Sequence, residues 1–225
     1  MASLHPKRLS YEGKNVDYWL SILGAGRRSE QMAKATEATR AMGTNILPIL
    51  VAHLDSRPGI YSLVTGSLEK RNGAVSAFYI LGKSAAPVIP ALERLVENGH
   101  YPMDAALALL GIGTNGIASL AKLAISEKPV ARYTAVGALG NINSDWELAV
   151  PTLIACLDHK DPETRSRAAS SLGRLRSTDP RIIVALQRTA LSDSDAMVKA
   201  TSSRVLSNIL NQTRAPKFPE SSPSQ

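Results

Sequence analysis

The stretch DHKDPETRSRAASSLGRL, residues 158–175, carries the local signals of one amphipathic helix. Asp161 can accept hydrogen bonds at the helix N-terminus, and Pro162 suits the first helical position, where no backbone N–H is needed. Gly173 suits the end of the helix, because glycine adopts a left-handed conformation without steric cost. The apolar face, with spacings of four, four and three residues, consists of Thr164, Ala168, Leu172 and Leu175. The stretch therefore predicts a helix with a single face to bury.

The same pattern recurs along the chain. Residues 129–142, PVARYTAVGALGNI, match residues 162–175 at six positions, where both segments have Pro, Arg, Ala, Leu, Gly and a final Ile or Leu. The apolar face returns after residue 175 as Val198, Ser202, Leu206 and Ile209. The glycines that close the corresponding segments recur at similar but unequal intervals, at Gly43, Gly82, Gly111, Gly140 and Gly173. This spacing indicates a structural repeat whose loops differ in length.

Each repeat contains a second apolar segment that begins near a proline, as in NILPILVAHL (45–54) and ELAVPTLIACL (147–157). A proline in the first turn marks the start of a helix. The first helix of each repeat has a small residue near its middle, namely Ala38, Ala77, Ala106, Ala135 and Ala168. Small residues let neighbouring helices approach closely. A pair of such short helices cannot bury its own apolar faces, so the pairs are expected to stack into an elongated solenoid.

The run Asp161-Pro162-Glu163-Thr164-Arg165, followed by Ala168-Ala169, Leu172 and Gly173, resembles the D-P-x-V-R-x-x-A-A-x-x-L-G core of HEAT repeats. It is most similar to the short type first grouped with phycobilisome lyases. The resemblance extends over residues 31–211 and is strongest in the last three repeats. It implies an all-α, right-handed, armadillo-like α-solenoid of about five to six helix pairs. Because this family consists mostly of interaction scaffolds, it also implies a protein-binding function.

Three segments are expected on this basis. Residues 1–30 form an N-terminal extension, in which the aromatic-rich stretch 15–23 is a short helix that caps the first repeat. Residues 31–211 form the solenoid, and residues 212–225, rich in Pro and Ser, are expected to be disordered. The N-terminal residues lack the apolar core of a signal peptide, and no run approaches about 18 apolar residues. We therefore expect a cytoplasmic protein without membrane contact.

The chain shows no convincing motif for catalysis or cofactor binding. Cys156 is the only cysteine, which excludes an intrachain disulfide and a cysteine-based metal site. None of the four histidines precedes a Glu, whereas HEAT-like deoxyhypusine hydroxylases carry repeated His-Glu pairs that bind two irons. Residues 77–84, AFYILGKS, fit a permissive phosphate-loop pattern, but they are bulky and belong to a repeat helix. We expect a protein that is not an enzyme and that has no cofactor or metal.

The basic residues fall into two groups. One cation recurs at the same helical position in the last three repeats, as Arg132, Arg165 and Lys199. This ladder predicts structural ion pairs, and Arg165 can pair with Asp161 one turn earlier on the same helix. Other arginines of the last repeats have no upstream counterparts, namely Arg167, Arg174, Arg176, Arg181, Arg188 and Arg204. The net charge is +7, and these six arginines predict a basic patch for an acidic protein or, as an alternative, nucleic acid.

The predicted function is a non-catalytic protein–protein interaction scaffold that binds through the surface of its stacked helices. Two alternatives stay open. The C-terminal repeats could bind nucleic acid, including as a HEAT-like DNA glycosylase, although that class uses several tryptophans and this chain has only Trp19 and Trp146. The repeat type also permits an enzyme accessory of the chromophore-lyase type. The oligomeric state is open.

Overall fold

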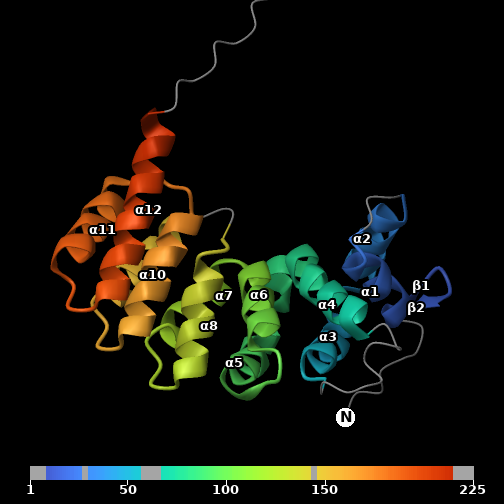
Figure 1. Ribbon diagram of the computed structural model, residues 1–225. Helices are drawn as coiled ribbons and strands as arrows, with labels where there is room; N and C mark the ends of the chain where they lie inside the picture. Colours follow the sequence, from blue (N-terminus) through green and yellow to red (C-terminus); the bar gives the residue numbers. More distant parts are fainter. Residues whose placement is uncertain (1–8, 27–29, 57–66, 143–145, 215–225) are drawn as a thin grey trace, which may run out of the picture.

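The structure is a computed structural model that describes residues 9–26, 30–56, 67–142 and 146–214 (Figure 1). Its helices form two layers along an elongated, curved stack. The first layer, in which each helix packs against the next, contains α4 (Ser67–Leu81), α6 (Pro102–Ile112), α8 (Pro129–Leu139), α10 (Pro162–Arg174) and α12 (Ala196–Arg214). The second layer, in which each helix packs against the first-layer helix that follows it, contains α3 (Leu47–Leu54), α5 (Ile89–Asn98), α7 (Thr114–Leu123), α9 (Val150–Cys156) and α11 (Pro180–Ser192). The predicted all-α repeat architecture is confirmed.

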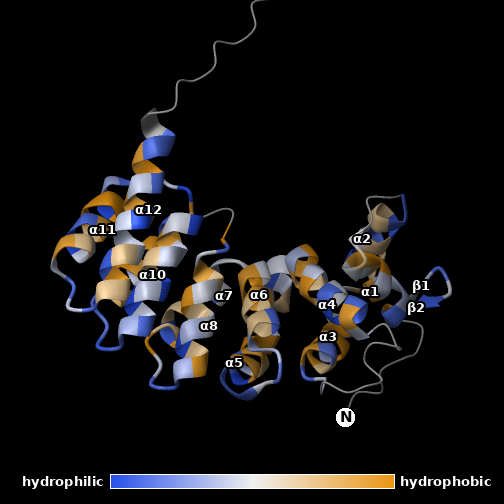
Figure 2. Cartoon of the chain, viewed as in Figure 1, coloured by the Kyte–Doolittle hydropathy of each residue, from blue (hydrophilic) through white to orange (hydrophobic). Residues whose placement is uncertain are grey.

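Short 3₁₀ segments precede three of the second-layer helices. They are η2 (Gly43–Ile46), η4 (Gly82–Val88) and η5 (Trp146–Leu148). Hydrophilic residues are concentrated in the turns of the C-terminal repeats (Figure 2). The buried apolar residues form one continuous cluster from Val16 to Ile209. Because every helix pair contributes to this cluster, no described repeat has a core of its own.

The local signals in the sequence place the helix starts correctly. The helix α10 begins at Pro162, and the Asp161 carboxylate accepts a hydrogen bond from the Glu163 backbone N–H at 3.3 Å. The helices α8 and α11 also begin at a proline, Pro129 and Pro180, and the Asp179 side chain caps α11, whereas α8 has no side-chain cap. The predicted small residues at the centre of the stack are fully buried, namely Ala38, Ala77, Ala106, Ala135 and Ala168.

The recurring glycines have two different roles, and the prediction recognised only one. Gly43 and Gly82 have φ values of 57° and 53°, so they end α2 (Glu30–Met42) and α4 in the left-handed conformation. Gly111 and Gly173 instead lie inside helices, where a Cβ would come within 2.8 Å of the Tyr79 backbone N and of a Val205 methyl, respectively. Contrary to the prediction, Gly173 therefore does not end α10 as a left-handed residue; the helix continues to Arg174, and the missing side chain of Gly173 makes room for Val205 of the next helix.

The N-terminal residues pack into the stack more extensively than a terminal cap would. A short antiparallel hairpin, β1 (Ser10–Tyr11) and β2 (Lys14–Asn15), leads into α1 (Val16–Gly24). Trp19 of α1 is buried, and the rings of Tyr11 and Tyr18 contact it edge-on. The helix α1 packs most extensively against α4, and less against α2. The predicted cap on the first repeat thus lies mainly against the second.

Polar contacts hold α1 in this position. The Asp17 carboxylate of α1 accepts hydrogen bonds from His53 of α3 at 2.9 Å and from Lys70 of α4 at 3.0 Å. The pKa of Asp17 is lowered, because these two hydrogen bonds outweigh the opposing effect of burial. At the other end of the chain, α12 continues to Arg214, beyond the predicted solenoid boundary at residue 211. The predictions for residues 1–8 and 215–225 lie outside the described residues.

One helical stretch, Ser67–Asn98, is long and apolar enough to cross a membrane by length and composition. It differs from a single spanning helix, because Gly82 with its φ of 53° and the segment η4 divide it into α4 and α5. These two helices belong to different layers of the stack, and Ala77 and Phe78 lie in the core. The stretch is therefore one helix pair of the solenoid.

One of the closest helix contacts gives a test of the fold. A Cβ at Gly73 of α4 would lie 2.0 Å from the Leu20 carbonyl oxygen of α1, so Gly73→Ala must push the two backbones apart. We expect the free energy of unfolding to fall by about 2–4 kcal/mol, measured by urea denaturation.

Gly137→Ala in α8 is the matched control, because a Cβ there meets only the flexible Met103 methyl at 3.4 Å. Because alanine has a higher helix propensity than glycine, we expect this variant to leave the free energy of unfolding unchanged or to raise it by up to about 1 kcal/mol. Equal losses in the two variants would contradict the described crossing of α1 and α4.

Candidate functional site

Arg132 is a buried link between two successive first-layer helices. Its Nε donates to Thr164 Oγ1 at 2.8 Å and its Nη2 to Asp161 Oδ2 at 3.1 Å, so α8 is bonded to the first turn of α10. Its Nη1 also donates to the Ser126 carbonyl oxygen at 2.6 Å. Because the protein itself supplies all three hydrogen-bond partners of the buried guanidinium, Arg132 is a structural residue.

Arg165 forms the same link one repeat later. Its Nε and Nη2 donate to the two carboxylate oxygens of Asp193 at 2.8 and 2.7 Å, which connects α10 to the loop before α12. The predicted pairing of Arg165 with Asp161 is wrong. Asp161 faces the preceding repeat, where it accepts from Arg132, while Arg165 reaches forward to the following one.

The structure adds one member to this ladder and shows where it ends. Arg71 of α4 donates from Nε to Asp104 of α6 at 2.7 Å, and its guanidinium lies 3.5 Å from the centre of the Tyr101 ring. Arg71 precedes the central alanine of its helix, Ala77, by six residues, whereas Arg132 and Arg165 precede theirs by three. The repeat pattern in the sequence therefore did not identify Arg71. Lys199, the predicted last member, is exposed on α12, the last helix of the described residues.

Two carboxylates of the ladder, Asp161 and Asp193, are stabilised in their charged form. The hydrogen bonds from Arg165 lower the pKa of Asp193, against the opposing effect of burial. For Asp161, desolvation raises the pKa, but hydrogen bonds from Thr164, Tyr133 and Arg132 outweigh it and lower the pKa well below its ordinary value. The arginines and carboxylates of the ladder therefore form ion pairs with each other, and these pairs hold consecutive helices together.

Four of the six remaining arginines line two adjoining open grooves on the first layer. The first, here called the α8–α10 groove, has a volume of about 480 Å³ and contains Arg167 and Arg174. Arg167 pairs with Glu163 at 2.6 Å and lies over the Tyr133 ring, 4.9 Å from its centre. Arg174 donates from Nη2 to the Gly137 carbonyl oxygen at 2.9 Å and to Ser171 Oγ at 2.8 Å.

The second, here called the α10–α12 groove, has a volume of about 400 Å³ and shares Arg174 with the first. Arg176, which follows α10, and Arg204 of α12 line it as well. Its other polar lining residues are neutral, namely Ser170, Asn208 and Gln212, and no carboxylate is among the described residues that line it. Within the described ranges, Arg174, Arg176 and Arg204 form no ion pair. The groove is thus a positive site without a carboxylate among its described lining residues. The sequence analysis named its three arginines but not Asn208 and Gln212 of α12, which complete it.

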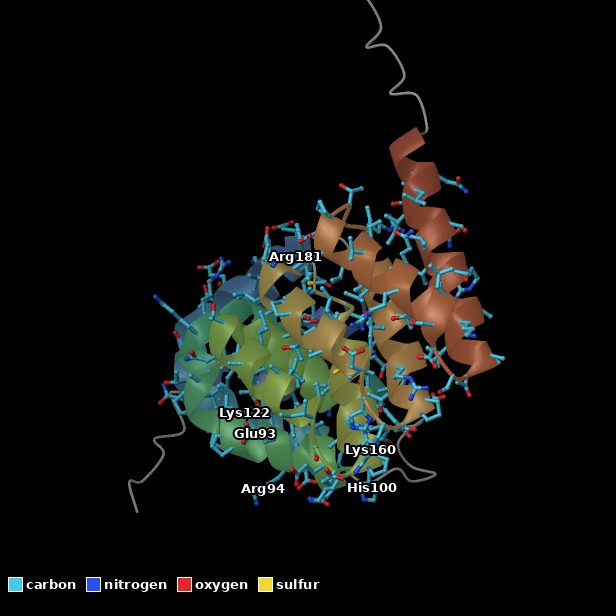
Figure 3. The ribbon with its side chains drawn as sticks, turned by 90° about the vertical axis from the view of Figure 1, so that its left-hand side faces the viewer. Glu93, Arg94, His100, Lys122, Lys160 and Arg181 are labelled. Atoms are coloured by element: carbon cyan, nitrogen blue, oxygen red, sulfur yellow. The ribbon has the colours of Figure 1, made fainter. Side chains whose placement is uncertain are left out.

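Arg181 and Arg188 do not belong to this surface, so the prediction of a single six-arginine patch is corrected. Both lie on α11 in the second layer, where Arg181 pairs with Asp179 at 2.6 Å and Arg188 with Asp158 at 2.9 Å. They flank a separate open groove of about 590 Å³ formed by apolar residues that include Ile154 and Val184. Figure 3 shows Arg181 at the upper edge of the molecule, apart from α12 at the right.

The other titratable groups of the described residues form no candidate metal centre or reactive thiol. Cys156 is buried and donates from Sγ to the Ala124 carbonyl oxygen at 3.7 Å, and burial raises the pKa of its thiol to about 11. It is therefore a structural residue, as the sequence predicted. Within the described part of the chain, no three His, Cys, Asp or Glu side chains form a cluster that could hold a metal ion.

Residues 117–207, from α7 to α12, match the family model for HEAT repeats. Among solved structures, the chain is similar to an engineered protein, with 21% identity, a TM-score of 0.42 and coverage of 87% of this chain and 96% of that one. It is also similar to human deoxyhypusine hydroxylase in complex with glycerol, with 19% identity, a TM-score of 0.46 and coverage of 85% and 73%. A designed armadillo repeat protein gives 17% identity, a TM-score of 0.40 and coverage of 90% and 97%. No curated protein matches.

The helix layers described above define the class of the chain as an all-α repeat protein with a solenoid architecture, and residues 117–207 of it match HEAT repeats. The candidate site lies largely within the matched region, since α8 and α10 and most of α12 fall in residues 117–207. The arginines of the candidate site occur only in the C-terminal repeats, whereas the ladder arginines recur from repeat to repeat.

The ladder predicts a dependence of stability on pH. A carboxylate whose pKa is lowered on folding stabilises the protein above its unfolded pKa, and this stabilisation is lost as the pH falls through the folded value. The free energy of unfolding is therefore expected to decrease as the pH drops below about 4. Asp193→Asn should lower it by about 2–4 kcal/mol at neutral pH and make the decrease on acidification smaller.

Asp158→Asn is the control, because the Arg188 and Asp158 side chains are 53% and 63% exposed, against 12% and 6% for Arg165 and Asp193. An exposed pair contributes less than about 1 kcal/mol. If denaturation at several pH values gave the same loss for the two variants, Asp193 would not hold the stack together.

Proposed function

We propose that the chain is a non-catalytic scaffold that binds an acidic segment of a partner protein along the α8–α10 and α10–α12 grooves. The observation that carries this proposal is the α10–α12 groove, where three arginines gather without a carboxylate. Arg174 belongs to both grooves, so one extended acidic segment can contact them in succession. We also propose that the repeats belong to the short HEAT type. The close spacing of Gly111, Gly140 and Gly173 along the chain supports this assignment.

The charges of the grooves favour an anionic ligand. The pKa of Arg174 is lowered, first by burial and then by the positive charge of Arg167. Two guanidinium groups close enough to interact in this way repel each other, and an anion between them would relieve the repulsion. The hydrogen bonds from Arg174 to Gly137 and Ser171 hold its side chain in place before a ligand arrives, which reduces the entropy lost on binding.

One feature of the grooves supports a protein partner over nucleic acid. The residues that line the two grooves include no aromatic side chain on which a base could stack. Arginines, hydroxyls and amides suit the recognition of carboxylates or phosphates, and they lack an acid–base pair for catalysis.

The proposal is tested with a fluorescent peptide rich in Glu and Asp, titrated with the full chain and followed by anisotropy. Arg174→Gln combined with Arg204→Gln is expected to weaken binding by about tenfold or more, because two charge-assisted contacts are lost. Binding by the unmodified chain should weaken as salt rises from about 50 to about 200 mM, because salt screens exposed charges.

Arg181→Gln combined with Arg188→Gln removes the same charge from α11, and it should leave the affinity within about twofold. Equal losses in the two double variants would show that only net charge matters, and they would refute a defined site. Tighter binding of a duplex oligonucleotide than of the acidic peptide would replace the protein partner by nucleic acid.

A further inference from the structure

The turn that follows α10 contains a residue that is unusual for its backbone conformation. Arg176 has a φ of 49°, in the left-handed region, and its N–H donates to the Gly173 carbonyl oxygen at 3.3 Å. The residues at the corresponding ends of α2 and α4 are Gly43 and Gly82, with φ values of 57° and 53°. A side chain in this conformation costs about 1 kcal/mol relative to glycine. An arginine therefore occupies a position where glycine would be more stable.

The Arg176 side chain supplies what glycine could not. It lines the α10–α12 groove together with Arg174, two residues earlier, and with Arg204 of α12. Three guanidinium groups thus line one groove, one from α10, one from the turn after α10 and one from α12. Residues in sparsely populated backbone conformations cluster at ligand sites, so the conformation of Arg176 adds to the three arginines of the groove as an observation in favour of a ligand there.

We infer that the α10–α12 groove binds the phosphate group of a phosphoserine or phosphothreonine on the partner segment. This inference rests on the proposed function and specifies the ligand of the same site. A phosphate monoester carries about −1.5 to −2 charges at neutral pH and three strong acceptor oxygens, whereas a carboxylate carries one charge and two oxygens. Three arginines offer more charge and more donors than one carboxylate can use, and guanidinium groups match phosphate oxygens in bidentate geometry.

The rest of the groove suits a phosphorylated peptide. Ser170, one turn before Arg174, contributes a hydroxyl, and Asn208, one turn after Arg204, contributes an amide. These neutral donors complete the coordination of an anion without adding charge. The buried residues Val205 and Ile209 form an apolar floor on which the chain beside the phosphorylated residue can lie. Clusters of arginines that recognise a phosphorylated residue are a recurrent mode of peptide binding.

The test uses the full chain and three fluorescent peptides with the same acidic sequence, which differ at one position that holds phosphoserine, serine or glutamate. The phosphoserine peptide is expected to bind at least about tenfold more tightly than the serine peptide and more tightly than the glutamate peptide. Inorganic phosphate should compete with the phosphoserine peptide and have less effect on the other two.

Arg176→Gly separates recognition from stability. It should remove most of the preference for phosphoserine while leaving the melting temperature unchanged or raising it, since glycine suits the backbone there. Arg204→Gln, at an exposed position on α12, should weaken the preference as well. Arg181→Gln on α11 should retain it. A preference that survives in both Arg176→Gly and Arg204→Gln would overturn the inference.

The outcomes distinguish the two proposals. Equal affinities for the three peptides would overturn the phosphate site and leave the acidic-partner scaffold standing. No binding of any of the three peptides would overturn both. A 5′-phosphorylated single-stranded oligonucleotide that binds more tightly than the phosphoserine peptide would overturn the inference in favour of nucleic acid.

Discussion

The close contact between successive first-layer helices is the constraint on which the structure depends. Buried alanines at the centre of the helices let them approach, and glycines such as Gly111 and Gly173 leave space for the atoms of the neighbouring helix. No helix pair can bury its apolar face alone, so each depends on the next. The ion pairs from Arg71, Arg132 and Arg165 strengthen these contacts at the N-terminal turns. A larger side chain in the contact therefore disturbs two repeats at once.

The same packing creates the candidate binding surface. Arg174 and Arg204 belong to different repeats, yet they line one groove because α10 and α12 pack side by side. The ladder lies at the beginning of the first-layer helices, whereas the grooves extend towards their ends, where Arg174 and Arg176 follow Arg165 by two turns or more. One helix thus carries structural arginines and exposed arginines on separate parts of its surface, so binding can change without loss of the fold.

The sequence predicted the helices well and the neighbours of individual residues less well. Caps, N-terminal prolines and apolar stripes located α8, α10 and α11, because these signals act within one or two turns. The partner of Arg165 and the role of Gly173 were predicted wrongly, since both are decided by a residue outside α10, in the loop before α12 or in α12 itself. The six arginines without upstream counterparts had the same appearance in the sequence, yet four line the grooves and two pair with acids on the second layer.

By itself, the sequence determined that this chain forms short helices in pairs and that the pairs stack, because helix periodicity and helix ends are encoded by residues close to one another. Only the tertiary structure decided which charges are neutralised. Whether an arginine meets a carboxylate depends on the rotation and offset between helices of successive repeats, and loop length and local packing set that geometry. The left-handed conformation of Arg176 is also decided at this level, because no local signal in the sequence marks it.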